Sequence, residues 1–388
     1  MSVSTAVITE AELRDGVRQV CERFTDAYWR DVDARSAYPV EFVEALTRAG
    51  WLAVLVPEAY SGHGLGLSEA AVILDEINRS GANAAACHAQ MYTMGTLLRH
   101  GSEEQKERYL PQIATGDLRL QAFGVTEPEA GSDTTSIRTA ARREGDHYVI
   151  NGQKIWTSRA EHSDLMLLLA RTSPLDPGKG KWWGLSTFLV DLRQAPAEQL
   201  RIVPIATMIN HATTEVFMDD LVIPAENRIG EEGMGFRYIL DGMNAERILI
   251  AAECIGDGHW FMERSVRYAS NREVFGRKIG SNQGVSFPLA WARTRIEAAD
   301  LMRRRAAQLF DDGQPCAKEA NMAKLLAAEA SWEAANVCLD LHGGMGFARE
   351  ADVERKFRET RLYQVAPVTT NMVLAYIAHN VLKLPRSF

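Results

Sequence analysis

The first 116 residues carry hydrophobic positions at the spacing of amphipathic helices. Phe42, Leu46 and Ala49 recur at intervals of three and four residues, so that they share one helix face. Similar patterns predict helices at residues 68–80 and 83–100. We therefore expect this stretch to form a helical N-terminal domain.

One helix start is marked by its own residues. Ser102 followed by Gln105 is a capping box, in which each side chain bonds the backbone N–H of the other residue. The helix that it opens is expected to end near Gly116, and Pro111 is expected to interrupt its last part.

Between residues 117 and 230 the pattern changes to short segments divided by turn residues. Glu144-Gly145-Asp146 predicts a tight turn, and Asn151-Gly152 predicts a hairpin, because glycine adopts positive φ at no steric cost. Short strands at this spacing are typical of a small antiparallel sandwich or barrel. The strands are expected at residues 138–142, 147–150, 154–157, 165–171, 186–191, 200–204 and 215–218.

From residue 231 the helical pattern returns. The segment 234–270 is hydrophobic on most sides, as expected for an inner bundle helix, and a glycine-rich HGGMG turn lies at 342–346. Further helices are expected at residues 282–311, 317–341, 350–361 and 370–382. The sequence thus predicts an α+β chain with three domains: a helical domain over 1–116, an antiparallel β domain over 117–230 and a four-helix bundle over 231–388.

Composition and charge exclude several classes of protein. The 388 residues are 46% hydrophobic and 24% charged, which is typical of a globular protein. A net charge of −8 argues against general nucleic-acid binding, which needs a basic face. No apolar run is long enough to insert into a membrane, and residues 1–10 lack the features of a signal peptide. The five cysteines show no metal-ligand spacing, so we expect a cytoplasmic protein with reduced thiols.

The stretch FGVTEPEAGSD, residues 123–133, fits neither a helix nor a strand. Gly124 and Gly131 allow a ligand to approach the backbone closely, and Thr126 and Ser132 add hydroxyl groups. Such a loop can surround the polar edge of a ligand with hydrogen bonds. An ordinary surface turn between domains is the alternative interpretation, and composition alone does not separate the two.

A second stretch, NGQKIWTSRA at residues 151–160, favours the ligand interpretation. Trp156 offers a flat aromatic face, and Thr157 and Ser158 offer hydroxyls that can bond the edge of a planar heterocycle. A tryptophan in a strand is more often part of the core. The two stretches together are far more specific than either alone.

These stretches resemble the acyl-CoA dehydrogenase family, flavoenzymes that introduce a double bond between Cα and Cβ of acyl-CoA thioesters. The resemblance covers nearly the whole chain, including an RxxFG segment at 272–276 and the HGGMG turn. It implies the three-domain fold and an FAD cofactor. It also implies that Thr126 meets the pyrimidine edge of the flavin, that Trp156 lies beside its ring and that Ser158 faces its N5 side. The implied flavin site contains Phe123, Val125, Thr126, Gly131, Ser132, Trp156, Thr157 and Ser158.

The resemblance assigns a second group of residues to the adenine-dinucleotide half of FAD, bound across a dimer interface. Arg272 can bond a pyrophosphate with its forked guanidinium, and Phe275 can pack on the nucleotide. An exposed arginine in a connecting loop is the alternative for Arg272 taken alone. Asp340 replaces a glutamine that the family often carries, so its contact with FAD stays open. The group consists of Arg272, Phe275, Gln283, Asp340, Gly343, Gly344, Thr369 and Asn371.

The catalytic position departs from the commonest family pattern. Many members carry a glutamate in a Tyr-Glu-Gly-Thr stretch, where this chain reads Ala366-Pro367-Val368-Thr369. A minority, including isovaleryl and long-chain types, places the glutamate on the inner helix just before an arginine. Glu246-Arg247 matches that arrangement, so the resemblance implies that Glu246 is the catalytic base. The substrate contacts that it implies are Ser132, Asn244 and Arg247.

The surroundings of Glu246 are consistent with this role. Its neighbours one turn away are Gly242, Met243, Leu249 and Ile250, so burial is expected to raise its pKa. Gly242 is expected to leave space for a ligand. Glu253, two turns further along the helix, is expected to be structural.

Three functions fit these residues. The first is FAD-dependent dehydrogenation of an acyl-CoA in fatty acid metabolism; the second is an acyl-CoA oxidase that uses oxygen; the third is a non-catalytic protein that binds flavin or acyl-CoA only. By resemblance we expect the first, with an electron-transfer flavoprotein as electron acceptor and a homotetramer as the assembly. Acyl chain length and branching stay open, because pocket depth depends on helix packing.

Overall fold

The computed structural model describes residues 8–176 and 178–386. The first seven residues, which entered the expectations about the N-terminal region, lie outside the described residues. The chain forms two compact units. We call Val32–Gly64 with Ala85–Glu246 the sheet unit, and Met1–Asp31 with Leu65–Ala84 and Arg247–Phe388 the helical unit.

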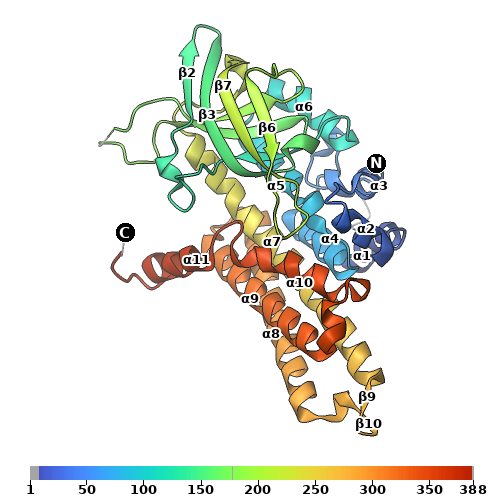
Figure 1. Cartoon of the computed structure of the whole chain (residues 1–388). Coiled ribbons are helices and arrows are strands. Elements are labelled where there is room, and N and C mark those ends of the chain that lie inside the picture. Colours follow the sequence, from blue (N-terminus) through green and yellow to red (C-terminus); the bar gives the residue numbers. More distant parts are fainter. Residues whose placement is uncertain (1–7, 177, 387–388) are drawn as a thin grey trace, which may run out of the picture. The chain divides into compact units, whose positions relative to one another are not determined.

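The sheet unit is built around one mixed sheet (Figure 1). Its strand order is β6-β7-β3-β2-β4-β5-β8, and β1 pairs with β4. The strands are β1 (Leu120–Gly124), β2 (Ala140–Glu144), β3 (His147–Ser158), β4 (Leu165–Arg171), β5 (Leu185–Asp191), β6 (Leu200–Pro204), β7 (Thr213–Pro224) and β8 (Arg228–Ile229). Pairs are antiparallel except that β4 runs parallel to β1 and to β2. The prediction of a purely antiparallel sheet is therefore wrong. The β2–β3 hairpin comes between β1 and β4 in the chain and provides the long crossover that parallel strands need.

Strand β4 is buried on both faces, which explains its uninterrupted apolar sequence. Met166 and Leu168 belong to one hydrophobic cluster of the sheet, whereas Leu165 and Leu167 belong to a second cluster. The second cluster also contains Leu97 of α5 (His88–His100), so one face of the sheet packs against helices. The predicted bounds of this strand, 165–171, are confirmed.

The hairpin expected at Asn151-Gly152 is wrong, because both residues lie inside β3. The pairing register between β3 and β7 shifts between Ile150 and Gly152, and Gly152 has φ 152°. A Cβ atom at Gly152 would lie 2.5 Å from the hydroxyl of Thr139. The glycine therefore permits close packing inside the sheet rather than a turn. The turn at Glu144-Gly145-Asp146 is confirmed, with Gly145 at φ 64°.

The helices of the sheet unit include α3 (Val40–Arg48), α5 and α6 (Glu103–Thr115). The capping box that opens α6 is confirmed, since Gln105 N–H donates to Ser102 Oγ at 3.2 Å and Ser102 N–H donates to Gln105 Oε1 at 3.0 Å. Pro111 lies inside α6 and does not interrupt it. A proline removes one backbone hydrogen bond, and the buried neighbours Leu110 and Ile113 hold the helix on both sides of it.

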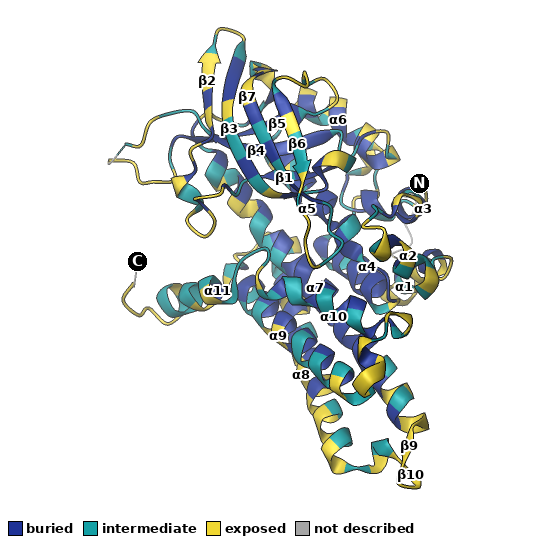
Figure 2. Ribbon diagram, viewed as in Figure 1, coloured by how far each residue is buried: buried dark blue, intermediate teal, exposed yellow. Residues whose placement is uncertain are grey.

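The helical unit contains the predicted C-terminal bundle (Figure 1). Its described helices are α1 (Glu10–Cys21), the start of α2 (Asp26–Ala34), α4 (Leu67–Arg79), α7 (Gly235–Asn271) from Arg247 onward, α8 (Gln283–Asp311), α9 (Ala317–His342), α10 (Val353–Arg361) and α11 (Thr370–Tyr376). A short hairpin of β9 (Glu273–Val274) and β10 (Arg277–Lys278) joins α7 to α8. Figure 2 shows a mostly buried α7, whereas α8 and the hairpin are largely exposed. Among the described residues, no helix combines the length and the apolarity that crossing a membrane requires.

Candidate functional site

The two motif stretches of the sheet unit are joined by a buried ion pair. Lys154, which is fully buried in β3, donates to Glu127 Oε1 at 2.8 Å and to the carbonyl of Val125 at 2.9 Å. Ile155 N–H donates to the carbonyl of Thr126 at 2.9 Å. These contacts fix the loop at residues 125–127 against the strand that carries Trp156.

Each charge of this pair shifts the pKa of the other residue, in opposite directions. Burial lowers the pKa of Lys154 to about 8, although the Glu127 carboxylate raises it. Burial raises the pKa of Glu127, but the charge of Lys154 and the N–H groups of Arg138 and Thr139 outweigh it, so that this pKa lies below its ordinary value. Sequence reasoning missed the pair. The first stretch holds two glutamates, Glu127 and Glu129, and the second holds one lysine, but the sequence does not indicate which carboxylate is buried.

Trp156 occupies a strained position at the end of β3. The register between β3 and β7 shifts between Lys154 and Thr157, and Trp156 has φ 60°, a left-handed conformation that is unfavourable for a large side chain. The residue nevertheless remains accessible to solvent, since 56% of its surface is exposed. The exposure of Trp156 excludes the core tryptophan that was the alternative, and strain of this kind is typical of functional sites.

The polar groups beside Trp156 are available to a ligand. Within the described residues, neither the Thr126 hydroxyl nor the Ser158 hydroxyl has a hydrogen-bond partner, and both residues are partly exposed. Thr157 is buried, and its carbonyl accepts a hydrogen bond from Thr214 at 2.7 Å. Gly131 and Ser132 lie in the exposed part of the loop, and a Cβ atom at Gly131 would meet no atom within 4 Å. The structure therefore brings Val125 and Thr126 beside the end of β3, whereas Gly131 and Ser132 lie in the exposed part of the loop.

Glu246 lies on α7 and is 8% exposed. Its helix neighbours Leu249 and Ile250 are buried, as expected, whereas Met243 is partly exposed. The expectation that Gly242 leaves space for a ligand is wrong. A Cβ atom at Gly242 would lie 3.3 Å from the hydroxyl of Thr96 and 3.5 Å from the carbonyl of Tyr92, so α5 fills that space. Asn244 and Arg247, the other predicted contacts on α7, are both partly buried.

The residues predicted for the adenine half of FAD lie on the exposed surface of the helical unit. Phe275, in the β9–β10 hairpin, is 100% exposed and has φ 52°. Arg272 and Gln283 flank this hairpin and are also exposed. The ring of Tyr268, one turn before Arg272, lies 4.3 Å from the ring of His342, the first residue of the HGGMG turn. The RxxFG segment and the glycine-rich turn therefore lie close together, with Asp340, Gly343 and Gly344 exposed beside them.

The segment around position 367 is held by hydrogen bonds between side chains and backbone groups. Lys324 of α9 is fully buried and donates to the carbonyl of Val368 at 2.7 Å. The Thr369 hydroxyl caps α11 by accepting from Met372 N–H at 3.3 Å, and Asn371 follows in an exposed position. Pro367 itself offers no group that accepts a proton.

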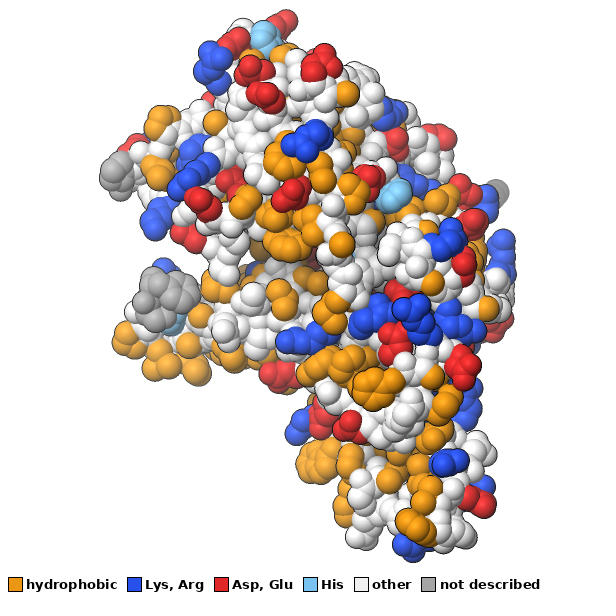
Figure 3. All heavy atoms as spheres, in the orientation of Figure 1, with side chains coloured by type: hydrophobic (Ala, Val, Ile, Leu, Met, Phe, Trp, Pro, Cys, Tyr) orange, Lys and Arg blue, Asp and Glu red, His pale blue; other side chains and the backbone are white. Residues whose placement is uncertain are grey.

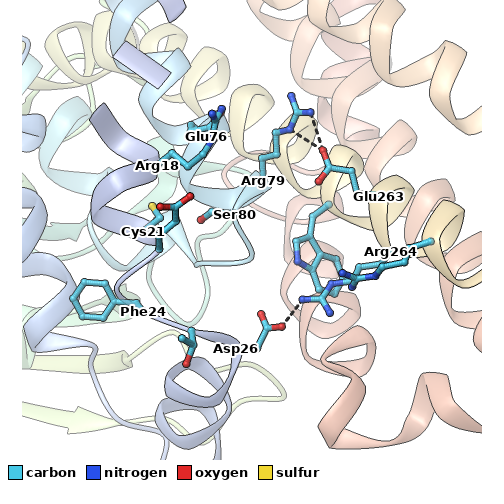
Figure 4. A pocket seen from close by; sticks show the side chains of 13 residues that line it. Arg18, Cys21, Phe24, Asp26, Glu76, Arg79, Ser80, Glu263 and Arg264 are labelled. Atoms are coloured by element: carbon cyan, nitrogen blue, oxygen red, sulfur yellow. Dashed lines mark hydrogen bonds and ion pairs between the residues drawn. The ribbon is translucent and has the colours of Figure 1, made fainter. Parts of the chain in front are cut away.

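A separate pocket of about 700 Å³ lies in the helical unit (Figure 4). Arg79 donates to Glu263 at 2.8 Å, Arg264 donates to Asp26, and Arg18 pairs with Glu76. Most of the opposite charges of this pocket therefore pair with each other, and no predicted site residue lines it. We assign it no ligand.

Family models match almost the whole chain. The acyl-CoA dehydrogenase N-terminal domain matches residues 9–117, the middle domain matches 122–221 and the C-terminal domain matches 233–382. The chain belongs to the acyl-CoA dehydrogenase family. This membership and the expected order of a helical, a β and a second helical domain are thereby confirmed.

Individual relatives in this family differ in their named activities. Acyl-CoA dehydrogenase FadE12 of Mycobacterium tuberculosis is 33% identical over 97% of this chain and 96% of its own length. The caffeyl-CoA reductase-Etf complex subunit CarC of Acetobacterium woodii is 32% identical over 91% of this chain and 92% of its own. The solved structure of a glutaryl-CoA dehydrogenase in complex with glutaryl-CoA superposes with a TM-score of 0.90 at 27% identity, covering 100% of this chain and 98% of that one.

Proposed function

We propose that this protein is an FAD-dependent acyl-CoA dehydrogenase in which Glu246 removes the α-proton. One observation carries the proposal. Residue 367, where many family members carry the catalytic glutamate, is a proline here, whereas a nearly buried glutamate precedes Arg247 on α7. A carboxylate with little contact to water is a stronger base than one in solution.

The reaction requires one proton acceptor from the chain. The carbonyl of a thioester acidifies the neighbouring α-proton, and the Glu246 carboxylate accepts that proton as the double bond forms. FAD, when bound, supplies the acceptor for the hydride that leaves Cβ. We propose that the substrate is oriented by Ser132, Asn244 and Arg247. We also propose three domains, over residues 1–116, 117–230 and 231–388.

The residues of the sheet unit fit a flavin. The exposed indole of Trp156 can cover one face of a planar ring, and the hydroxyls of Thr126 and Ser158 can bond its polar edge. Trp156 is exposed and has a strained backbone, and this combination favours a ligand role over a core role. Phe123, Val125, Gly131, Ser132 and Thr157 complete the proposed flavin site.

The residues of the helical unit fit an interface that only a second copy completes. Phe275 is fully exposed, and Phe287, Trp291 and Leu301 of α8 are exposed as well. Figure 3 shows hydrophobic side chains on the surface around α8. We propose a homotetramer in which this surface is covered and Arg272, Phe275, Gln283, Gly343, Gly344, Thr369 and Asn371 hold the adenine-dinucleotide half of FAD, with the contact of Asp340 left open. Electron-transfer flavoprotein is the proposed electron acceptor, supported by the relative named as an Etf complex subunit.

Anaerobic titration of the purified protein with a panel of acyl-CoA thioesters tests this function. We expect denaturation to release FAD, and we expect at least one saturated thioester to bleach the flavin while the matching enoyl-CoA forms. Rapid stoichiometric peroxide formation in air would identify the oxidase alternative. A flavin that no thioester of the panel reduces would favour the non-catalytic alternative.

A further inference from the structure

Arg159 is a buried cation that the proposed mechanism does not use. It follows Ser158 directly at the end of β3, is 3% exposed and has φ 60°. Its backbone N–H donates to the carbonyl of Ala212 at 2.7 Å, which fixes the residue against the connection that carries His211. The side chain therefore has a defined position inside the sheet unit.

The guanidinium of Arg159 has no carboxylate partner among the described residues. Nη1 donates to the carbonyl of Ala85 and lies 3.4 Å from Nε2 of His211, and Nη2 lies 3.5 Å from Nε2 of His88. Nε has no partner in the described chain. A guanidinium has five N–H donors and stays charged, so a buried one without a counter-charge is costly. Lys154, five residues earlier and equally buried, has its glutamate.

The two histidines do not provide the missing negative charge. Burial, the charge of Arg159 and the nearby ring of His88 together hold the pKa of His211 well below its ordinary value, so His211 is neutral. The rings of His88 and His211 lie 6.4 Å apart, and each contacts a different terminal nitrogen of the guanidinium. The cluster is thus a polar region with net positive charge and incomplete hydrogen bonding.

We infer that Arg159, with His88 and His211, binds a carboxylate at the distal end of the substrate's acyl group. This inference rests on the proposed function and narrows its substrate class to acyl-CoA thioesters that carry a second, free carboxylate. A carboxylate matches the guanidinium in charge and in its forked geometry, and it supplies acceptors to the N–H groups that are left over. Arg159 directly follows Ser158, the proposed flavin-facing residue, so we test the inference first with an acyl group of five carbons.

A matched pair of thioesters tests the inference. Glutaryl-CoA and pentanoyl-CoA have acyl chains of equal length and differ in the terminal carboxylate, so calorimetric binding to the FAD-loaded protein isolates that group. We expect glutaryl-CoA to bind about 10- to 100-fold more tightly, as a charge-assisted hydrogen bond predicts. In Arg159→Met this preference is expected to vanish while pentanoyl-CoA still bleaches the flavin. Arg159→Lys, which keeps the charge but loses the fork, is expected to retain part of the preference.

Arg119→Met is the matched control, since Arg119 is an arginine of the same unit whose guanidinium bonds the hydroxyl of Thr47. It is expected to leave the preference unchanged. Equal binding of the two thioesters by the wild-type protein would overturn the inference even if no Arg159 variant folds, and so would a preference that survives in Arg159→Met. If pentanoyl-CoA reduces the flavin and glutaryl-CoA has no advantage, the inference fails and the proposed function stands. If no thioester of the wider panel reduces the flavin, the proposed function fails, and the binding comparison still decides whether the cluster recognises a carboxylate.

Discussion

Two glutamates on α7 are both buried, yet their surroundings differ. Glu253 is fully buried and accepts a hydrogen bond from the Tyr363 hydroxyl at 2.8 Å, and its own backbone carbonyl accepts from Asn78. Glu246, two turns earlier and our proposed base, keeps 8% of its surface exposed. Burial alone therefore does not identify a catalytic carboxylate. What distinguishes the two is that Glu253 is fully buried and bonded by the Tyr363 hydroxyl, whereas Glu246 keeps a small exposed surface.

Replacing Glu246 provides the largest expected effect. Glu246→Gln keeps the size of the side chain but removes the proton acceptor, so flavin reduction by acyl-CoA should slow by about 10²- to 10⁴-fold. FAD content and thermal stability should stay near wild type. Stopped-flow absorbance under anaerobic conditions measures the rate. The comparison breaks if Glu253→Gln abolishes reduction while Glu246→Gln retains it, because the base would then lie further along the helix.

A third buried carboxylate, that of Glu127, extends the comparison to a carboxylate paired with a buried cation. Lys154→Met leaves Glu127 buried without its cation, and breaking such a pair costs about 3–5 kcal/mol. We expect that loss in urea unfolding, together with weaker FAD binding, because Lys154 also fixes the Val125 carbonyl. Arg193→Met, which removes an exposed pair with Asp191, is the control and should change stability by less than about 1 kcal/mol. A stability equal to wild type in Lys154→Met would show that this pair does not hold the loop.

Asp257 adds a carboxylate whose charge is unfavourable in the folded state. It is fully buried beside Lys356, and burial raises its pKa to about 7 although Lys356 lowers it. The folded protein thus favours the protonated form. Its contribution to stability is complete below the unfolded pKa near 3.8 and is lost as the pH rises through about 7. Each pKa unit corresponds to about 1.4 kcal/mol, so the effect amounts to a few kcal/mol.

The measurement for Asp257 is the unfolding free energy of wild type and Asp257→Asn between pH 4 and pH 8. The variant cannot titrate at this position, so its stability relative to wild type should increase as the pH rises across this range. A difference between the two proteins that does not change with pH would contradict the raised pKa.

The sequence predicted most of the elements and some of the site, and the failures have physical reasons. The bounds of β4 were predictable because both faces are buried, so the strand is apolar without interruption. Gly152 is ambiguous in the sequence because a glycine marks either a turn or a close contact, and only the position of Thr139 decides between them. The partners of Arg159 could not be foreseen either, since His88 and His211 come from distant segments that only the fold brings to one place.

The smallest expected effect tests why Glu253 is structural. Tyr363→Phe removes the hydroxyl that bonds the Glu253 carboxylate, so a buried acceptor loses a partner at a cost of about 1–3 kcal/mol. Burial raises the pKa of Tyr363 well above its ordinary value, so the tyrosine is a neutral donor at every pH at which the protein is assayed. We expect a lower unfolding midpoint in urea and an unchanged rate of flavin reduction once the protein is folded. Glu253→Gln combined with Tyr363→Phe should cost less than the sum of the two single changes, because both affect the same hydrogen bond. If Tyr363→Phe slows flavin reduction as much as Glu246→Gln does, while stability is unchanged, Glu253 belongs to the catalytic machinery and the contrast between the two glutamates is lost.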